Sequence, residues 1–265
     1  MPSQKHPVIS QEGDLHLWKT GQYSDVRVTC RGQSMLLHRA ILSRCPWFKE
    51  KMGNQFSDNN MLEINLDRFS PVCSRLFCRS STALRFGNIL LLWQTSTNPP
   101  PTEINDNSLQ PNTFFDHEVL AQLYGLGATF KFPLFQTAVL NTGIEFLNSG
   151  IQYFSCRPRK KLTAGQIDQL LRGLRIAYAG DVQQQATLRG LYVHFFTECW
   201  RNVQNDPYFF GQIRAVPMFS VDLMENVGRK NAGRDRLETT IYTVQVCNNV
   251  TPSLEAAMKA AWEQD

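Results

Sequence analysis

The sequence of 265 residues lacks a long hydrophobic run. Its longest uncharged apolar stretch, Ile89 to Trp93, is far shorter than the roughly 20 residues that a membrane-spanning helix needs. Residues 1–20 mix charged and polar side chains without an apolar block, so they do not resemble a secretory signal. We therefore predict no membrane span and expect the protein in the cytoplasm, the nucleus or both.

An excess of charge of one sign is also missing. The 27 Lys and Arg residues against 23 Asp and Glu residues leave a net charge of +4. Spread over this length, that charge is too weak to indicate nucleic acid or a membrane surface as a partner. The seven cysteines are odd in number and dispersed, which favours reduced, mostly buried thiols over disulfides. No fixed-period repeat occurs, which excludes solenoids and propellers.

Motifs that carry catalytic or metal chemistry are absent. Asp25 and His38 have no nucleophile and no orienting group signalled near them. The run Gly125-Leu126-Gly127 lacks the third glycine of a dinucleotide fingerprint. Cys73 and Cys78 have no second pair of ligands at zinc-binding spacing. We predict that the protein is not an enzyme and needs no cofactor or metal.

The spacing of apolar residues changes twice in the N-terminal part of the sequence. Val26–Cys30 alternates between apolar and polar residues as a half-buried strand does, and Gln33–Leu37 follows as its hairpin partner. Ile41–Met52 has helical spacing, which Pro46 should divide into two short helices. Leu62–Leu66 alternates again. Strands and helices in this order predict a mixed α+β unit.

The rest of the chain has mainly helical patterns. Apolar stripes over 119–124 and 135–146, with Gly125, Gly127 and Pro133 between them, predict an antiparallel helix pair. Further on, four signals follow in order. They are a capping box at Thr163 and Gln166, a helix start at Asp206-Pro207, a weak strand pattern over 238–247 and a last helix start at Thr251-Pro252.

Two stretches have the composition of connections. Residues 94–113 contain Pro99-Pro100-Pro101 among many Asn and Thr residues. Residues 150–162 predict a linker between an N-terminal domain, 1–149, and a helical C-terminal region, 163–265. The linker carries a basic run that is either a solvated surface or a nuclear localisation patch: Arg157, Arg159, Lys160 and Lys161.

Several motifs resemble the BTB/POZ family in order and spacing. Ser24-Asp25-Val26 matches the start of the family's first strand, and His38-Arg39-Ala40-Ile41-Leu42 matches a helix start. Phe48 stands at an aromatic position, and Pro71 opens a helix after the third strand. The resemblance covers about residues 15–149. It implies an α+β fold, a small mixed sheet capped by helices, followed here by an α-helical region. The whole chain looks most like fungal BTB proteins of undetermined function.

The resemblance is interrupted after Phe77. We expect core segments at about 15–78 and 114–149 and an irregular stretch at 79–113, because Arg79-Ser80-Ser81-Thr82 replaces the apolar contacts of the family's helix. The stretch is either a lineage-specific insertion or the product of a misplaced exon boundary, and the loss of the helical pattern favours the second.

The resemblance implies a non-catalytic module that binds proteins. Family members commonly pair through an N-terminal segment, here Leu15, Leu17 and Trp18, which implies a homodimer. Adaptors of cullin-type ubiquitin ligases use a hydrophobic-x-Glu element before the third strand. Phe56-Ser57-Asp58 has this form with Asp in place of Glu, unless Phe56 only packs inward to close a loop. The alternative function is a nuclear or transcriptional scaffold.

Overall fold

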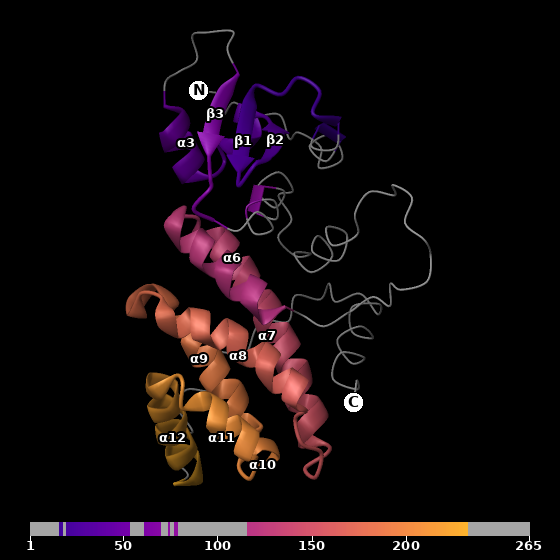
Figure 1. The fold of residues 1–265 in the computed structure, drawn as a ribbon, viewed down its shortest axis with the longest axis vertical. Helices are drawn as coiled ribbons and strands as arrows, with labels where there is room; N and C mark the ends of the chain where they lie inside the picture. Colours follow the sequence, from indigo (N-terminus) through magenta and orange to yellow (C-terminus); the bar gives the residue numbers. More distant parts are fainter. Residues whose placement is uncertain are drawn as a thin grey trace, which may run out of the picture. The chain divides into compact units, whose positions relative to one another are not determined.

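The computed structural model describes residues 16–17, 20–53, 61–69, 74, 77–78 and 116–232. They divide into two compact units (Figure 1). The first unit holds the N-terminal sheet and its helices together with Leu126–Phe135, and the second holds the remaining helices. The stretch predicted to be irregular, the strand pattern over 238–247 and the helix start at Thr251 lie outside the described residues.

A three-stranded mixed sheet forms the base of the first unit. β1 (Val26–Cys30) pairs antiparallel with β2 (Gln33–Leu37) and parallel with β3 (Leu62–Asn65), so the strand order is β2-β1-β3. The hairpin turn places Arg31 at φ 46° and Gly32 at φ 81°. Two successive positive φ angles match the twist of the strands that they connect. The three predicted strands are confirmed.

The two faces of the sheet differ in polarity. Val26 and Val28 are fully buried on one face. On the other face Arg27 of β1 forms an ion pair with Glu63 of β3 at 3.0 Å, with both side chains largely exposed. A surface pair of this kind contributes little stability. Burial of the apolar face therefore stabilises the sheet.

Two short helices pack with this sheet, α2 (Arg39–Leu42) and α3 (Pro46–Met52). Pro46 occupies the first turn of α3, as its fixed φ and missing N–H predict. A carboxylate oxygen of Asp25 accepts the backbone N–H of Arg39 at 2.7 Å at the start of α2. The ring of His38 contacts the carbonyl oxygen of Gln22 at 2.6 Å. Asp25 and His38 thus both contact the backbone, Asp25 at the start of α2 and His38 at the segment that precedes β1.

The core of the first unit is a cluster of aromatic rings around Phe130, which has no exposed surface. Its ring centroid lies 4.6 Å from Trp47, 5.8 Å from Phe48, 5.2 Å from Phe69 and 4.5 Å from Phe77. Phe48 and Phe77 are also fully buried. Leu126–Phe135 therefore completes a core that the N-terminal residues begin.

The second unit is helical (Figure 1). Its helices are α6 (His117–Thr129), α7 (Pro133–Ser155), α8 (Ala164–Ala179), α9 (Val182–Glu198), α10 (Trp200–Val203), α11 (Pro207–Ile213) and α12 (Pro217–Asn231). The last turn of α6 and the first residues of α7 belong to the first unit. The predicted α-helical region after the sheet is confirmed.

Two helix boundaries differ from the prediction. α6 continues through Gly125 and Gly127, and α7 continues through Gly150 to Ser155. A glycine in a helix costs about 1 kcal/mol. Burial of the apolar residues that follow, such as Leu126 and Phe154, outweighs that cost. The first part of the predicted 150–162 linker is therefore helical.

Most of α6 and α7 belongs to the second unit, together with the C-terminal helices. Leu120 of α6 lies within 2.9 Å of the position that a Cβ on Gly143 of α7 would take, and Leu191 of α9 lies within 3.5 Å of it. These contacts join α6 and α7 to the C-terminal helices. Sequence patterns within each helix do not report such pairings.

Helix starts follow the predicted signals. Thr163 and Gln166 form a complete capping box at the start of α8. The side chain of Asp206 accepts two backbone N–H groups at the start of α11, with Pro207 in the first turn. The side chain of Asp181 accepts the backbone N–H of Gln184 and so caps the start of α9, a start that was not predicted.

A single side chain closes the turn between α8 and α9. The guanidinium group of Arg189 donates to the carbonyl oxygens of Ala177 at 2.9 Å, Tyr178 at 3.3 Å and Gly180 at 2.8 Å. The last carbonyls of a helix have no partner within it. Arg189 therefore satisfies the end of α8 and ties it to α9.

Gly173 lies at a close approach of helices in the second unit. A Cβ on this residue would lie 2.2 Å from the Tyr192 hydroxyl oxygen and 2.3 Å from the carbonyl oxygen of His117. A hydrogen side chain is required for α8 to pack against α9 and the start of α6 at this distance.

We expect Gly173→Ala to lower the free energy of unfolding by about 2 kcal/mol or more, because the added methyl group forces the helices apart. Urea unfolding followed by circular dichroism measures this change. Gly211→Ala is the matched control, since nothing lies within 4 Å of its Cβ position, and it should leave stability unchanged or raise it by up to about 1 kcal/mol. Equal behaviour of the two variants would contradict the close approach.

Candidate functional site

The residues predicted to bind partners in the N-terminal region are mostly beyond the described ranges. Phe56 and Asp58 lie outside the described residues, as do Leu15 and Trp18. Leu17 lies half-buried in a helical turn. The predicted cullin-binding and dimer contacts therefore stay predictions.

Some large apolar side chains of the first unit face solvent. Tyr23 is 88% exposed, and Leu36 on β2 is 42% exposed. Single exposed apolar residues are common in globular proteins and do not define a site by themselves. The described part of the first unit therefore does not by itself identify a partner surface.

The described cysteines agree with the prediction of reduced and mostly buried thiols. Cys30, Cys45, Cys78 and Cys199 are buried and free, whereas Cys156 is exposed. Burial raises the pKa of the Cys45 and Cys78 thiols, and it raises the pKa of Cys199 to about 12. A thiol acts as a nucleophile through its thiolate form. These three buried thiols are therefore neutral at pH 7 and unsuited to nucleophilic chemistry.

The basic run between α7 and α8 is anchored to neighbouring helices. The Arg157 guanidinium lies 4.2 Å from the centroid of the Tyr153 ring. The side-chain amide of Asn202 on α10 donates to the carbonyl oxygen of Arg157 at 3.4 Å and to that of Lys160 at 2.7 Å. The connection has a fixed backbone, although its charges at Arg157, Arg159 and Lys161 remain exposed.

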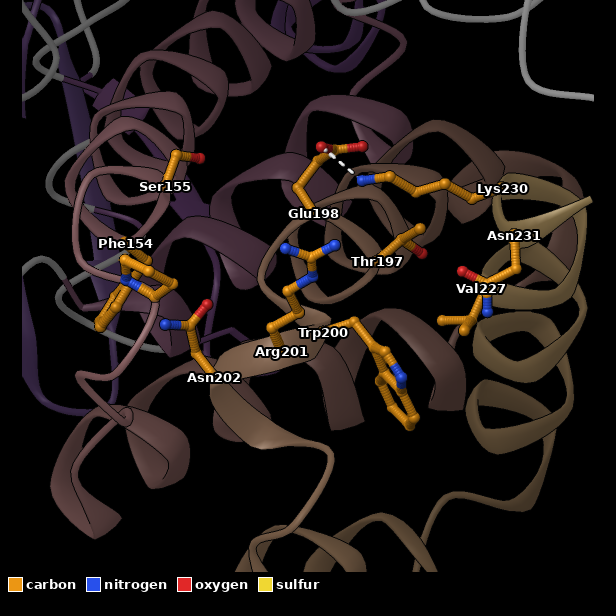
Figure 2. A pocket seen from close by; sticks show the side chains of 11 residues that line it. Phe154, Ser155, Thr197, Glu198, Trp200, Arg201, Asn202, Val227, Lys230 and Asn231 are labelled. Carbon is orange, nitrogen blue, oxygen red and sulfur yellow. Dashed lines mark hydrogen bonds and ion pairs between the residues drawn. The ribbon is translucent and has the colours of Figure 1, made fainter. Parts of the chain in front are cut away.

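A cavity of about 300 Å³ lies beside this connection (Figure 2). The ends of α7, α9 and α12, together with α10 and Pro158, surround it. Its lining residues are Phe154, Ser155, Pro158, Thr197, Glu198, Trp200, Arg201, Asn202, Val227, Lys230 and Asn231. No local motif marks this site in the sequence, because its residues come from separate helix ends.

The described lining carries more positive than negative charge. Lys230 donates to a carboxylate oxygen of Glu198 at 2.7 Å, as Figure 2 shows. Arg201 is exposed and has no ion-pair partner among the described residues. Thr197 is 6% exposed, and its hydroxyl oxygen has no hydrogen-bond partner. Within the described lining, Arg201 is thus a cation without an ion-pair partner, and Thr197 carries a buried hydroxyl without a hydrogen-bond partner.

The described ranges were also compared with what a metal site and a membrane span require. No group of three or more His, Cys, Asp or Glu side chains in these ranges is arranged to hold a metal ion. Among the helices that the structure describes, none is both long and apolar enough to cross a bilayer.

Comparison with known families identifies the N-terminal part. Residues 15–77 match the family model of the BTB/POZ domain. The chain contains a BTB/POZ domain. The BTB match covers β1, β2 and β3 with α2 and α3, so the small mixed sheet with helices is the BTB fold. The chain matches no curated protein.

The BTB match supports a coarse functional statement. BTB domains are protein–protein interaction modules, so this part of the chain is one. The match ends at Phe77, whereas the aromatic core around that residue also requires Phe130. The resemblance to fungal BTB proteins in particular stays a prediction.

A buried histidine in the second unit provides a test of the packing there. His117 is fully buried, and its Nδ1 lies 3.3 Å from the Tyr192 hydroxyl oxygen. Burial lowers the pKa of His117 from 6.5 to about 3. Between these two pH values the unfolded chain binds a proton that the folded protein does not.

We therefore expect the free energy of unfolding to fall as the pH drops from about 6.5 towards 3, with His117 contributing up to about 1.4 kcal/mol per pH unit. Urea midpoints measured along this pH range test it. His117→Asn should make the decline shallower, whereas His16→Asn, which replaces an exposed histidine, should not. An unchanged slope in His117→Asn would show that this ring does not titrate differently in the two states.

Proposed function

We propose that the chain is a non-catalytic adaptor whose BTB domain binds the cullin scaffold of a ubiquitin ligase. The observation that supports this proposal is the BTB match over residues 15–77. The segment with Phe56 and Asp58 falls within this match, between the end of α3 at Met52 and the start of β3 at Leu62. That is the position of the cullin-binding element in adaptors that the chain resembles.

In this proposal the two residues of the element have different weights. Phe56 is the anchor, because a large aromatic side chain placed in a desolvated pocket contributes most of the energy of such contacts. Asp58 lies at the rim, where a charge contributes less because water screens it. The substitution of Asp for Glu shortens the acid by one methylene group but keeps its charge.

The same proposal includes a homodimer. Leu15, Leu17 and Trp18 precede β1 and supply apolar surface to a second copy of the chain. Paired BTB domains would then present two substrate-binding chains to the ligase. Cytoplasm and nucleus are both compatible with this function.

A nuclear or transcriptional scaffold is the second candidate. The exposed charges of Arg157, Arg159 and Lys161, together with Lys160, favour it as a localisation signal. To act as a nuclear localisation signal in an extended conformation, this run would have to release its contacts with Tyr153 and Asn202. This requirement makes the adaptor the better supported of the two functions.

Phe56→Ala is expected to weaken binding of the full chain to a cullin N-terminal domain by at least tenfold, because loss of an aromatic anchor costs about 2 kcal/mol or more. Asp58→Ala should weaken it by a few-fold. Isothermal titration calorimetry measures both affinities, and thermal unfolding confirms that each variant is folded.

Tyr23→Ala is the matched control, since it removes an exposed aromatic side chain of the same unit outside the element, and it should leave the affinity unchanged. If Phe56→Ala lowers the melting temperature but not the affinity, Phe56 is a core residue and the proposed contact is wrong. If the unmodified chain does not bind the cullin domain, the adaptor function itself is wrong.

A further inference from the structure

We propose that the cavity between the ends of α7, α9, α10 and α12 binds an acidic segment of a partner protein. The proposal does not depend on the cullin contact, because the cavity lies in the second unit and uses none of the residues of the BTB match. It assigns a binding role to helices that follow the BTB domain.

The size of the cavity fits a side chain better than a whole cofactor. A volume of about 300 Å³ stands at the lower limit of ligand pockets in proteins. Trp200 and Val227 supply apolar surface to the lining, and Ser155 and Asn231 supply polar groups. A short aliphatic stem with a polar end matches this mixture.

The charges select an anion as the polar end. Among the described residues of the lining, Glu198 is the single acidic one, and Lys230 already pairs with it at 2.7 Å. Arg201 has no ion-pair partner in the part of the chain that the structure describes. A guanidinium group forms two parallel hydrogen bonds with a carboxylate, which favours an Asp or Glu side chain as its partner.

The Thr197 hydroxyl group points to the same chemistry. It is buried in the last turn of α9 without a hydrogen-bond partner, an unfavourable state for a polar group. In the view of Figure 2 its side chain lies between those of Arg201 and Val227. Rotation about χ1 would turn the hydroxyl group, which could then donate to a carboxylate oxygen held by Arg201.

The surroundings of the cavity favour a peptide over a small anion. Pro158 of the lining belongs to the connection whose exposed charges are Arg157, Arg159 and Lys161. These cations are neighbours of Pro158 in the chain and add positive charge near the cavity. A segment with several acidic residues would contact both the cavity and the connection at once.

The same surface is a poor match for single-stranded nucleic acid. Bases stack on the open faces of aromatic side chains. The Arg157 guanidinium already lies over the Tyr153 ring and covers one of its faces. An acidic peptide needs no stacking surface and is therefore the better occupant.

Fluorescence anisotropy of a fluorescein-labelled decaglutamate peptide, titrated with the full chain, tests the proposal. We expect saturable binding that Arg201→Gln weakens by about tenfold. Thr197→Val should weaken it by about threefold while the melting temperature stays the same or rises, because the variant removes a buried hydroxyl that has no partner. Arg172→Gln removes an exposed arginine of α8 that does not line the cavity, and it should have no effect.

Three outcomes would overturn the proposal. The first is the absence of saturable binding by the unmodified chain. The second is an equal loss of affinity in Arg201→Gln and Arg172→Gln, which would show attraction by net charge alone. The third is an equally tight complex with a labelled deoxythymidine decanucleotide, which would make the surface a general site for polyanions. Since the cullin titration uses a different ligand and different variants, failure of one experiment leaves the other interpretable.

Discussion

Burial of the Phe130 ring is the interaction on which the BTB unit depends. The ring contacts residues from α3, from the segment that follows β3 and from the last described helical turn of the BTB match. Contact between Phe77 and Phe130 closes the chain between them into a loop, and the entropic cost of loop closure grows only slowly with the length of the loop. Burial of one aromatic side chain, worth about 2–3 kcal/mol, offsets a good part of that cost. A BTB domain cut at Phe77 would therefore lack the centre of its own core.

Periodicity predicted those parts of the fold in which each element buries one face. β1 alternates strictly, and Pro46 divides α2 from α3 as its chemistry requires. The capping box at Thr163 also predicted the start of α8 correctly, because its hydrogen bonds join residues that are close in the sequence. Glycine misled the prediction at Gly125 and Gly150. There the preference of one residue was weaker than the packing of its neighbours in the folded protein.

The candidate sites also differ in whether neighbouring residues in the sequence form them. Phe56 and Asp58 could be proposed from sequence because a family motif is contiguous. The cavity near Arg201 could not, since its lining depends on where the ends of α7, α9 and α12 meet. The uncompensated charge of Arg201 becomes informative only after the pairing of Glu198 with Lys230 is known. The sequence does show the basic run beside it, but a run of cations alone is typical of any solvated connection.

The turn between α8 and α9 has a consequence for how this sequence can vary. Arg189 reaches three carbonyl oxygens of that turn, and Asp181 caps the helix that carries Arg189. A residue inserted in this turn would shift its carbonyl oxygens relative to Arg189 by about 1.5 Å or more. The three hydrogen bonds could not all form after such a shift. Evolutionary changes in length should therefore avoid this turn, and a homologue that gains a residue there should also have lost the arginine.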